Sequence, residues 1–165
     1  AAFTGFPVSL ITGKGTGIDH EAMQRKAQIV EQALKVNKPD PRDGLDVLAR
    51  VGGFEIGAIA GVILGAAASR VPVVIDGFIS GAGAMIARAL APSAVDFVLA
   101  SHLSEEPGHQ VMLTWLGVRP ILQMNMRLGE GTGAALSFTL IDAALKIAKE
   151  MATYDQAGVS DTGLR

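Results

Sequence analysis

The stretch Val71-Pro-Val-Val-Ile-Asp-Gly77, VPVVIDG, decides the fold class. Its first five residues are apolar and mostly β-branched, with no polar side chain on either face. This pattern is typical of a strand in a parallel sheet that helices cover on both sides. The stretch ends in Asp76-Gly77, and a segment rich in small residues follows at 79–90. We therefore predict a central parallel strand over 71–75.

Predicted helices and strands alternate along the rest of the chain. Helices are predicted over 19–36, 45–51, 54–69, 79–90, 104–116 and 134–151, and further strands over 97–100 and 120–124. Two prolines and a glycine between 37 and 44 separate the first two helices. Strands that alternate with helices indicate an α/β architecture. We predict a three-layer, Rossmann-like parallel sheet flanked by helices.

Composition narrows the function classes. The 165 residues are 49% hydrophobic and 18% charged, and the mean hydropathy is +0.37. A net charge of −2 without a basic stripe argues against nucleic-acid binding. The chain has no cysteine, which excludes disulfides and thiolate metal sites. We see no signal peptide and expect a cytoplasmic protein.

The run Ile56–Ser69 is the most membrane-like segment. It is short of the roughly 20 residues that span a bilayer. Its glycines Gly57, Gly61 and Gly65 recur every four residues, which in a membrane would indicate a helix-association face. In a soluble α/β protein the same spacing indicates a helix packed closely on a sheet or neighbour. We favour the soluble interpretation.

The loop GKGTG, Gly13 to Gly17, is a candidate anion site. Glycine amides before a helix N-terminus can bind a phosphate. The spacing matches neither a Walker loop nor a complete dinucleotide fingerprint, and a tight turn with a cap explains it equally well. Lys26, one to two helical turns further on, could reach back to a phosphate as a point charge, or could be a solvated helix lysine.

Polar residues also follow the predicted strands, where parallel sheets bind ligands. Asp76 could bind a ribose hydroxyl, orient another group or cap the next helix. The stretch SHLSEEPGH, Ser101 to His109, holds two histidines and two adjacent carboxylates. Its spacing matches none of the usual His-Glu metal motifs. The carboxylates also suit the N-terminus of a helix that Ser104 could cap.

The stretch RLGEGTGAAL, Arg127 to Leu136, places Glu130 among glycines. We expect this carboxylate to be partly desolvated, which would suit a general base. Glu130 could instead cap a helix or pair with Arg127. Taken together, the Gly13 loop, Asp76 and the Glu130 loop indicate a phosphate-and-base site.

Five motifs in register resemble one known family. GKGTGID, DVLARVGGFEI, VPVVIDGFIS, the SxEPGH pattern at Ser104–His109, and RLGEGTGAAL are similar to nicotinate-nucleotide–dimethylbenzimidazole phosphoribosyltransferases. The resemblance runs from about Ala1 to Ser160 and covers the C-terminal half of a family chain. We expect 1–157 to be the C-terminal part of the catalytic domain, with the last helix able to join a small helical subdomain, and 158–165 to be a flexible tail.

The resemblance implies transfer of ribose 5-phosphate from nicotinate mononucleotide to 5,6-dimethylbenzimidazole, without a cofactor or a metal. Glu130 falls on the general base. Further positions fall on substrate-binding motifs: Gly15, Thr16 and Gly17 at the phosphate, Lys26, Asp76 and Gly77 in the site, Ser104 and Gly108 near the nucleotide, and Leu128 at the aromatic base. The implied partners are a second copy, in a homodimer, and the missing N-terminal half, with neither nucleic acid nor membrane.

Other functions fit parts of the sequence. A related transferase could use a phenol or another benzimidazole as its acceptor. A non-catalytic nucleotide-binding α/β domain would keep the Gly13 loop and be indifferent to Glu130. An interaction protein would use the glycine-spaced helix instead.

Overall fold

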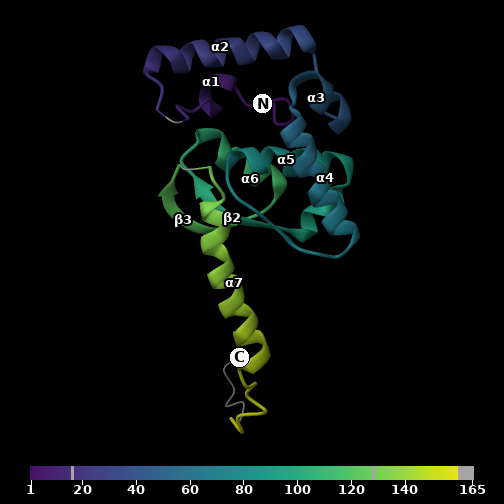
Figure 1. Ribbon diagram of the computed structural model, residues 1–165, viewed down its shortest axis with the longest axis vertical. Helices are drawn as coiled ribbons and strands as arrows, with labels where there is room; N and C mark the ends of the chain where they lie inside the picture. The colour runs from purple at the N-terminus through teal and green to yellow at the C-terminus, as the bar shows by residue number, and fades with distance from the viewer. Residues whose placement is uncertain (16, 128, 160–165) are drawn as a thin grey trace.

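The computed structural model shows a small parallel sheet with helices packed around it (Figure 1). It describes residues 1–15, 17–127 and 129–159. The elements, in chain order, are α1 (Val8–Ile11), α2 (His20–Asn37), α3 (Gly44–Val51), α4 (Phe54–Ala68), β1 (Val73–Ile75), α5 (Phe78–Leu90), the 3-10 helix η1 (Pro92–Phe97), β2 (Val98–Ser104), α6 (Pro107–Leu116), β3 (Pro120–Met126) and α7 (Thr132–Glu150). The predicted α/β fold with a parallel sheet flanked by helices is confirmed.

The strands lie in the order β1-β2-β3, and both pairs are parallel. Ile75 lies opposite Ala100, and Ala100 lies opposite Pro120. The register of β2 on β3 shifts between His102 and Ser104. Because parallel strands end at one edge, the residues that follow β1, β2 and β3 meet on the same side of the molecule.

The core forms where α4, α5 and α6 pack against each other and the sheet. Ile63, Leu113 and Leu116 are fully buried there, next to Ile75 and Ala100 from the strands. Burial of large aliphatic side chains supplies most of the driving force for folding, about 1.5–3 kcal/mol for each one removed from water. This core fixes the strand ends that carry the candidate site.

Side-chain caps explain where two early helices begin. The Asp19 carboxylate accepts a hydrogen bond from the Ala22 amide at 2.7 Å at the start of α2. Asp43 accepts from the amides of Leu45 and Asp46 at the start of α3. Such caps satisfy amides that have no partner within the helix. Val8–Ile11 forms the single helical turn α1.

The structure corrects three expectations from the sequence. β1 is an edge strand among the described residues, because it pairs with β2 alone and β2 lies at the centre. A Cβ added to Gly61 or Gly65 would meet no atom within 4 Å, so these glycines of α4 do not mark close packing in this chain. Ser104 ends β2 rather than capping α6, whose N-cap is Glu106.

The last helix, α7, extends away from the rest of the molecule (Figure 1). Its first turns contact β2 and β3, and its only buried residues in the described chain are Gly133 and Ser137. Beyond the first turns it exposes large apolar side chains: Phe138, Leu140, Leu145 and Ile147. In the described part of the chain, no helix combines the length and apolarity needed to cross a bilayer.

Candidate active site

One cavity of about 660 Å³ is lined by five of the eight predicted site residues that the structure describes. Its volume lies within the usual range of small-molecule sites, about 300–1,000 Å³. The lining comes from the Gly13–Gly17 loop, α2, α4, the turn from β1 into α5, the end of β2 with the segment that follows it, and the loop after β3. The residues are Gly15, Lys26, Ile59, Asp76, Gly77, Phe78, Ile79, Ser80, His102, Ser104, Glu106, Arg127, Gly129 and Gly131.

Lys26 links α2 to the Gly13 loop. Its ammonium Nζ donates a hydrogen bond to the carbonyl oxygen of Gly13 at 3.2 Å. The loop turns sharply, with left-handed φ angles of 55° at Gly15 and 116° at Gly17, values that favour glycine. The lysine thus reaches back to the loop. Lys26 and Gly15 both line the cavity, whereas Gly17 does not.

Asp76 caps the last helix rather than the next one. Its Oδ2 accepts a hydrogen bond from the Gly131 amide at 3.2 Å, and its Oδ1 accepts one from the Ala134 amide at 3.0 Å. The N-cap of α5 is Gly77, which has no side chain to cap that helix. The carboxylate therefore joins the end of β1 to the first turn of α7.

Glu130 lies in the turn just before α7, at the rim of the cavity. Its neighbours Gly129 and Gly131 both line the cavity, and Glu130 itself is exposed. The expected partial desolvation is therefore wrong for this chain, because no described residue lies within 4 Å of the Cβ positions at Gly129 and Gly131 to cover the turn. Glu130 is not the cap of α7, since Asp76 fills that role.

Ser104, Gly77 and Gly108 differ in their surroundings. Ser104 and Gly77 line the cavity. Gly108 is buried outside the lining, and a Cβ added there would lie 2.9 Å from the Ile11 carbonyl oxygen and 2.9 Å from the Phe78 ring. The structure therefore gives Gly108 a packing role beneath the site. Thr16 and Leu128 lie outside the described residues.

Two buried histidines support the site from below. His102 and His109 have ring centroids 6.1 Å apart and are almost wholly inaccessible. His109 Nδ1 accepts a hydrogen bond from the Ser104 amide at 2.9 Å, so the neutral ring carries its proton on Nε2. That nitrogen is buried and has no partner among the described residues. Burial, with the nearby His102, lowers the pKa of His109 to about 4, against the opposing effect of Asp76.

The sequence pattern did not single out several residues of the lining. One of them is His102, to which the sequence drew attention only as a metal-ligand candidate. The cationic Arg127 and the carboxylate of Glu106 also line the cavity. Their signal was their position directly after β3 and β2, where a parallel sheet exposes its ligand-binding edge.

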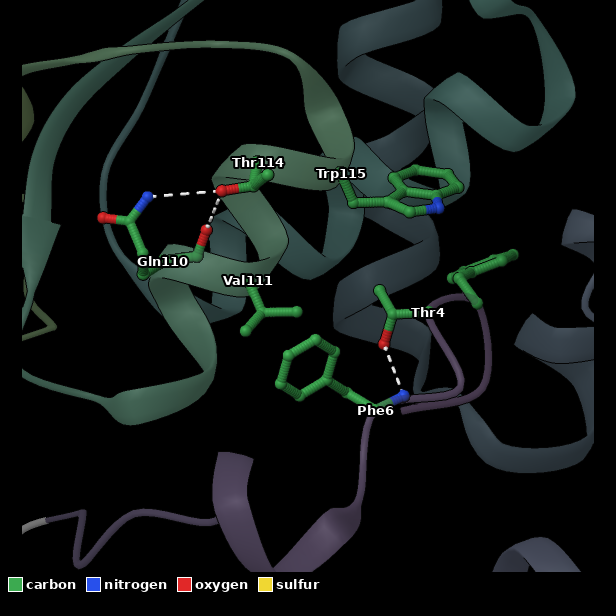
Figure 2. Close-up of a pocket in the computed structure, with 7 residues that line it drawn as sticks. Thr4, Phe6, Gln110, Val111, Thr114 and Trp115 are labelled. Atoms are coloured by element: carbon green, nitrogen blue, oxygen red, sulfur yellow. Dashed lines mark hydrogen bonds between the residues drawn. The ribbon is translucent and has the colours of Figure 1, made fainter.

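A second cavity, of about 520 Å³, lies between the N-terminal segment and α6 (Figure 2). It contains none of the predicted site residues. Its polar groups largely satisfy each other: the Thr114 hydroxyl donates to the Gln110 carbonyl oxygen, and the Phe6 amide donates to Thr4 Oγ1. Trp115 packs against Phe3 with ring centroids 5.3 Å apart. This cavity is a packing groove with no cluster of reactive groups.

With this geometry in place, comparison with known proteins identifies the family. A family model described as "Phosphoribosyltransferase" matches residues 1–159. The chain belongs to this phosphoribosyltransferase family. A nicotinate-nucleotide–dimethylbenzimidazole phosphoribosyltransferase from Desulforamulus reducens is 59% identical over 160 residues, which are 97% of this chain and 46% of that protein. One from Chloroflexus aggregans is 59% identical over 161 residues, or 98% of this chain and 46% of that protein.

Solved structures place the chain in the same phosphoribosyltransferase fold. The crystal structure of CobT from Thermus thermophilus superposes with a TM-score of 0.90 at 45% identity, covering 98% of this chain and 48% of that one. The resemblance seen in the five motifs is thereby confirmed. The chain spans about half the length of the relatives it matches.

Proposed function

We propose that this chain carries the C-terminal half of a phosphoribosyltransferase that moves the ribose 5-phosphate of nicotinate mononucleotide onto 5,6-dimethylbenzimidazole. One observation carries the proposal: the Gly13 loop with Lys26, and the loop that holds Glu130, open into one cavity. Had the two loops lain on opposite sides of the molecule, no single nucleotide could have bridged them. The names of the relatives support this choice of substrates.

The phosphate end of the site is assigned to Gly15, Thr16, Gly17 and Lys26. The ammonium of Lys26 now satisfies the Gly13 carbonyl oxygen and is placed to donate to a phosphate oxygen as well, since it carries three N–H donors. Binding energy gained at the phosphate, away from the reacting carbon, can hold the ribose in place for the reaction. Asp76, Gly77 and Ser104 are assigned to the ribose side of the cavity.

The chemical end is assigned to Glu130, with Leu128 beside the aromatic base. A nitrogen of the benzimidazole attacks C1′ and forms the new glycosidic bond. The bond from C1′ to the pyridinium nitrogen breaks, and its electron pair returns to nicotinate. Glu130 accepts the proton that the benzimidazole loses, a role that typically contributes 10²–10⁴-fold to the rate. Because the pyridinium leaves with its electron pair restored, its departure needs no strong acid.

We further propose that the N-terminal half of the family chain covers the exposed turn at Glu130, and that the whole protein is a homodimer. Support comes from surfaces that this chain leaves exposed. β1 is an edge strand among the described residues, and α7 exposes Phe138, Leu140, Leu145 and Ile147. A helical subdomain that includes α7 would bury this apolar surface.

The decisive experiment is a crystal of the full-length protein, this chain joined to its N-terminal half, soaked with nicotinate mononucleotide and a benzimidazole. We expect the phosphate at Lys26 and the Gly13 loop, and the aromatic base beside Glu130. Density for the phosphate elsewhere would overturn the assignment. A non-catalytic nucleotide-binding domain would instead show the nucleotide without any turnover by the same preparation.

A further inference from the structure

We propose that His102 is a positioning residue for this reaction: it holds the turn that carries Glu130 through contacts with Gly133 and Asp76. The inference rests on the proposed function for its catalytic meaning, but its structural part can be tested separately. His102 lies near the end of β2, lines the cavity and is 1% exposed. It would touch neither the transferred group nor the acceptor in the mechanism above.

The first contact is with the helix that follows Glu130. Gly133, in the first turn of α7, lies directly against the imidazole. A Cβ added to Gly133 would overlap Nδ1 and would lie 2.6 Å from Cε1 of the ring. No side chain therefore separates the start of α7 from the ring. The imidazole sets how closely the first turn of α7 can approach the sheet.

Hydrogen bonds then fix the orientation of the ring. Ser101 Oγ lies 3.0 Å from His102 Nδ1 and 3.0 Å from the Asp76 carbonyl oxygen. The carbonyl can only accept, so the single hydroxyl proton of Ser101 is directed to it. Ser101 Oγ then accepts from Nδ1, which places the ring proton on Nδ1. Asp76 Oδ1, 3.8 Å from the same nitrogen, also favours a proton there.

The second contact runs through Asp76 to the turn itself. The carboxylate that faces Nδ1 also accepts from the amides of Gly131 and Ala134. Gly131 is the residue after Glu130. One turn further along α7, the Ser137 hydroxyl lies within hydrogen-bond distance of the Ser101 carbonyl oxygen, at 3.3 Å. The imidazole thus lies at the centre of the contacts that join the strand ends to the first two turns of α7.

The location of these contacts predicts which kinetic constant will change. Lys26 lies on α2 and Gly15 in the loop before it, and neither is among the contacts described above for the His102 ring. A shift of the Glu130 turn should therefore slow the chemical step while nucleotide binding is retained. A misplacement of about 1 Å at a reacting group can cost on the order of 10²-fold in rate.

The test compares three variants in the full-length protein. His102→Phe keeps a ring but removes the Nδ1 donor, His102→Asn keeps an N–H donor near that position, and His20→Phe alters an exposed histidine on α2 as the control. We expect His102→Phe to lower kcat by roughly 10²-fold, with the Kd for nicotinate mononucleotide within about twofold of the unaltered value. We expect His102→Asn to recover most of the lost kcat, and His20→Phe to have no effect.

Hydrogen–deuterium exchange at the amides of Gly131 and Ala134, measured without substrate, gives the structural readout. We expect faster exchange in His102→Phe and near-normal exchange in His102→Asn. If His102→Phe does not fold, Gly133→Ala takes its place, since its new Cβ must displace the ring. The proposal would be overturned if His102→Phe left both amide exchange and kcat unchanged. It would also be overturned if both His102 variants lost kcat and nucleotide affinity to the same extent. A full-length protein that makes no product would overturn the proposed function alone, because exchange still reports whether His102 holds the turn.

Discussion

The Asp76 carboxylate accepts a hydrogen bond from the amide of Ala134, 58 positions further along the chain, at a distance of 3.0 Å. Through this bond and the one from Gly131, the end of β1 caps α7. Helix caps are usually local, supplied by a residue next to the helix. Here the cap comes from another layer of the fold, and it couples the strand edge to the turn that carries Glu130.

This coupling predicts the effect of removing the Asp76 carboxylate. Asp76→Ala leaves two amides without their acceptor, and we expect the free energy of unfolding to fall by about 1–2 kcal/mol. Urea denaturation of the full-length protein measures the change. Asp142→Ala, at an exposed position on α7, is the matched control and should change it by less than about 0.5 kcal/mol. Equal effects of the two substitutions would contradict the capping role.

Replacement of Glu130 by glutamine tests the general-base assignment. The amide keeps the shape of the side chain but cannot take a proton from the benzimidazole. We expect kcat of the full-length protein to fall by roughly 10²–10⁴-fold, with the Kd for nicotinate mononucleotide little changed. Glu150→Gln, at the end of α7, should leave both constants unchanged. Normal turnover in Glu130→Gln would remove Glu130 from the role of base.

Lys26→Met tests the phosphate end. The substitution keeps most of the aliphatic stem but removes the ammonium, and a hydrogen bond to a charged group contributes about 1.5–3 kcal/mol. We therefore expect KM for nicotinate mononucleotide to rise by roughly 10–100-fold, since 1.4 kcal/mol corresponds to a factor of ten. Steady-state kinetics measure this change. Lys35→Met, at an exposed position on the same helix, is the control, and a Lys26→Met enzyme with normal KM would argue against a phosphate at this loop.

His109 predicts how stability depends on pH. Its pKa is lowered to about 4 in the folded chain from an ordinary value of 6.5. Between these values the unfolded state binds more protons, so stability rises with pH and falls on acidification from pH 6.5 to pH 4. The full difference corresponds to about 3 kcal/mol.

His109→Asn checks this dependence. Its amide oxygen can accept from the Ser104 amide near the position of Nδ1, but the side chain does not titrate in this range. Urea denaturation at pH 4.5 and pH 7 should show a smaller loss of stability in His109→Asn than in the unaltered protein. His20→Asn, at an exposed histidine, should leave the loss unchanged. An identical acid response in all three proteins would show that His109 does not cause it.

The isolated chain gives a further test of the division into halves. The relatives are about twice as long, and Glu130 is exposed in this chain. We expect the 165 residues alone to form no detectable product from nicotinate mononucleotide and dimethylbenzimidazole. Addition of the separately produced N-terminal half should restore activity if the two halves associate. Robust turnover by the isolated chain would show that the other half is dispensable.

The fold class was predictable because its signals are local. The β-branched run before Asp76 predicted a strand, and the apolar periodicity of 19–36 predicted the helix α2. The sequence could not show that β1 lies at an edge, because strand order depends on which other strands pair with it. For the same reason, the spacing of Gly61 and Gly65 could not show whether another element lies against them.

The sequence predicted which loops form the site but not the contacts that join them. Because parallel strands end at one edge of a sheet, the parallel direction of the predicted strands was enough to place Asp76, Ser104 and the Glu130 loop at the same edge. The contacts of Asp76 with Gly131 and of His102 with Gly133 join residues far apart in the sequence. No local spacing encodes such contacts, so the sequence offered only the next helix as one that Asp76 could cap.

The position of β1 at the edge of the sheet affects how this chain associates with other molecules in solution. Among the described strands, Val73 and Val74 have hydrogen-bonding partners on one side only, in β2. An uncovered strand of this kind is a template for any extended segment of another molecule. Prepared alone, the chain should self-associate through this edge as its concentration rises, and light scattering over a dilution series would measure the association.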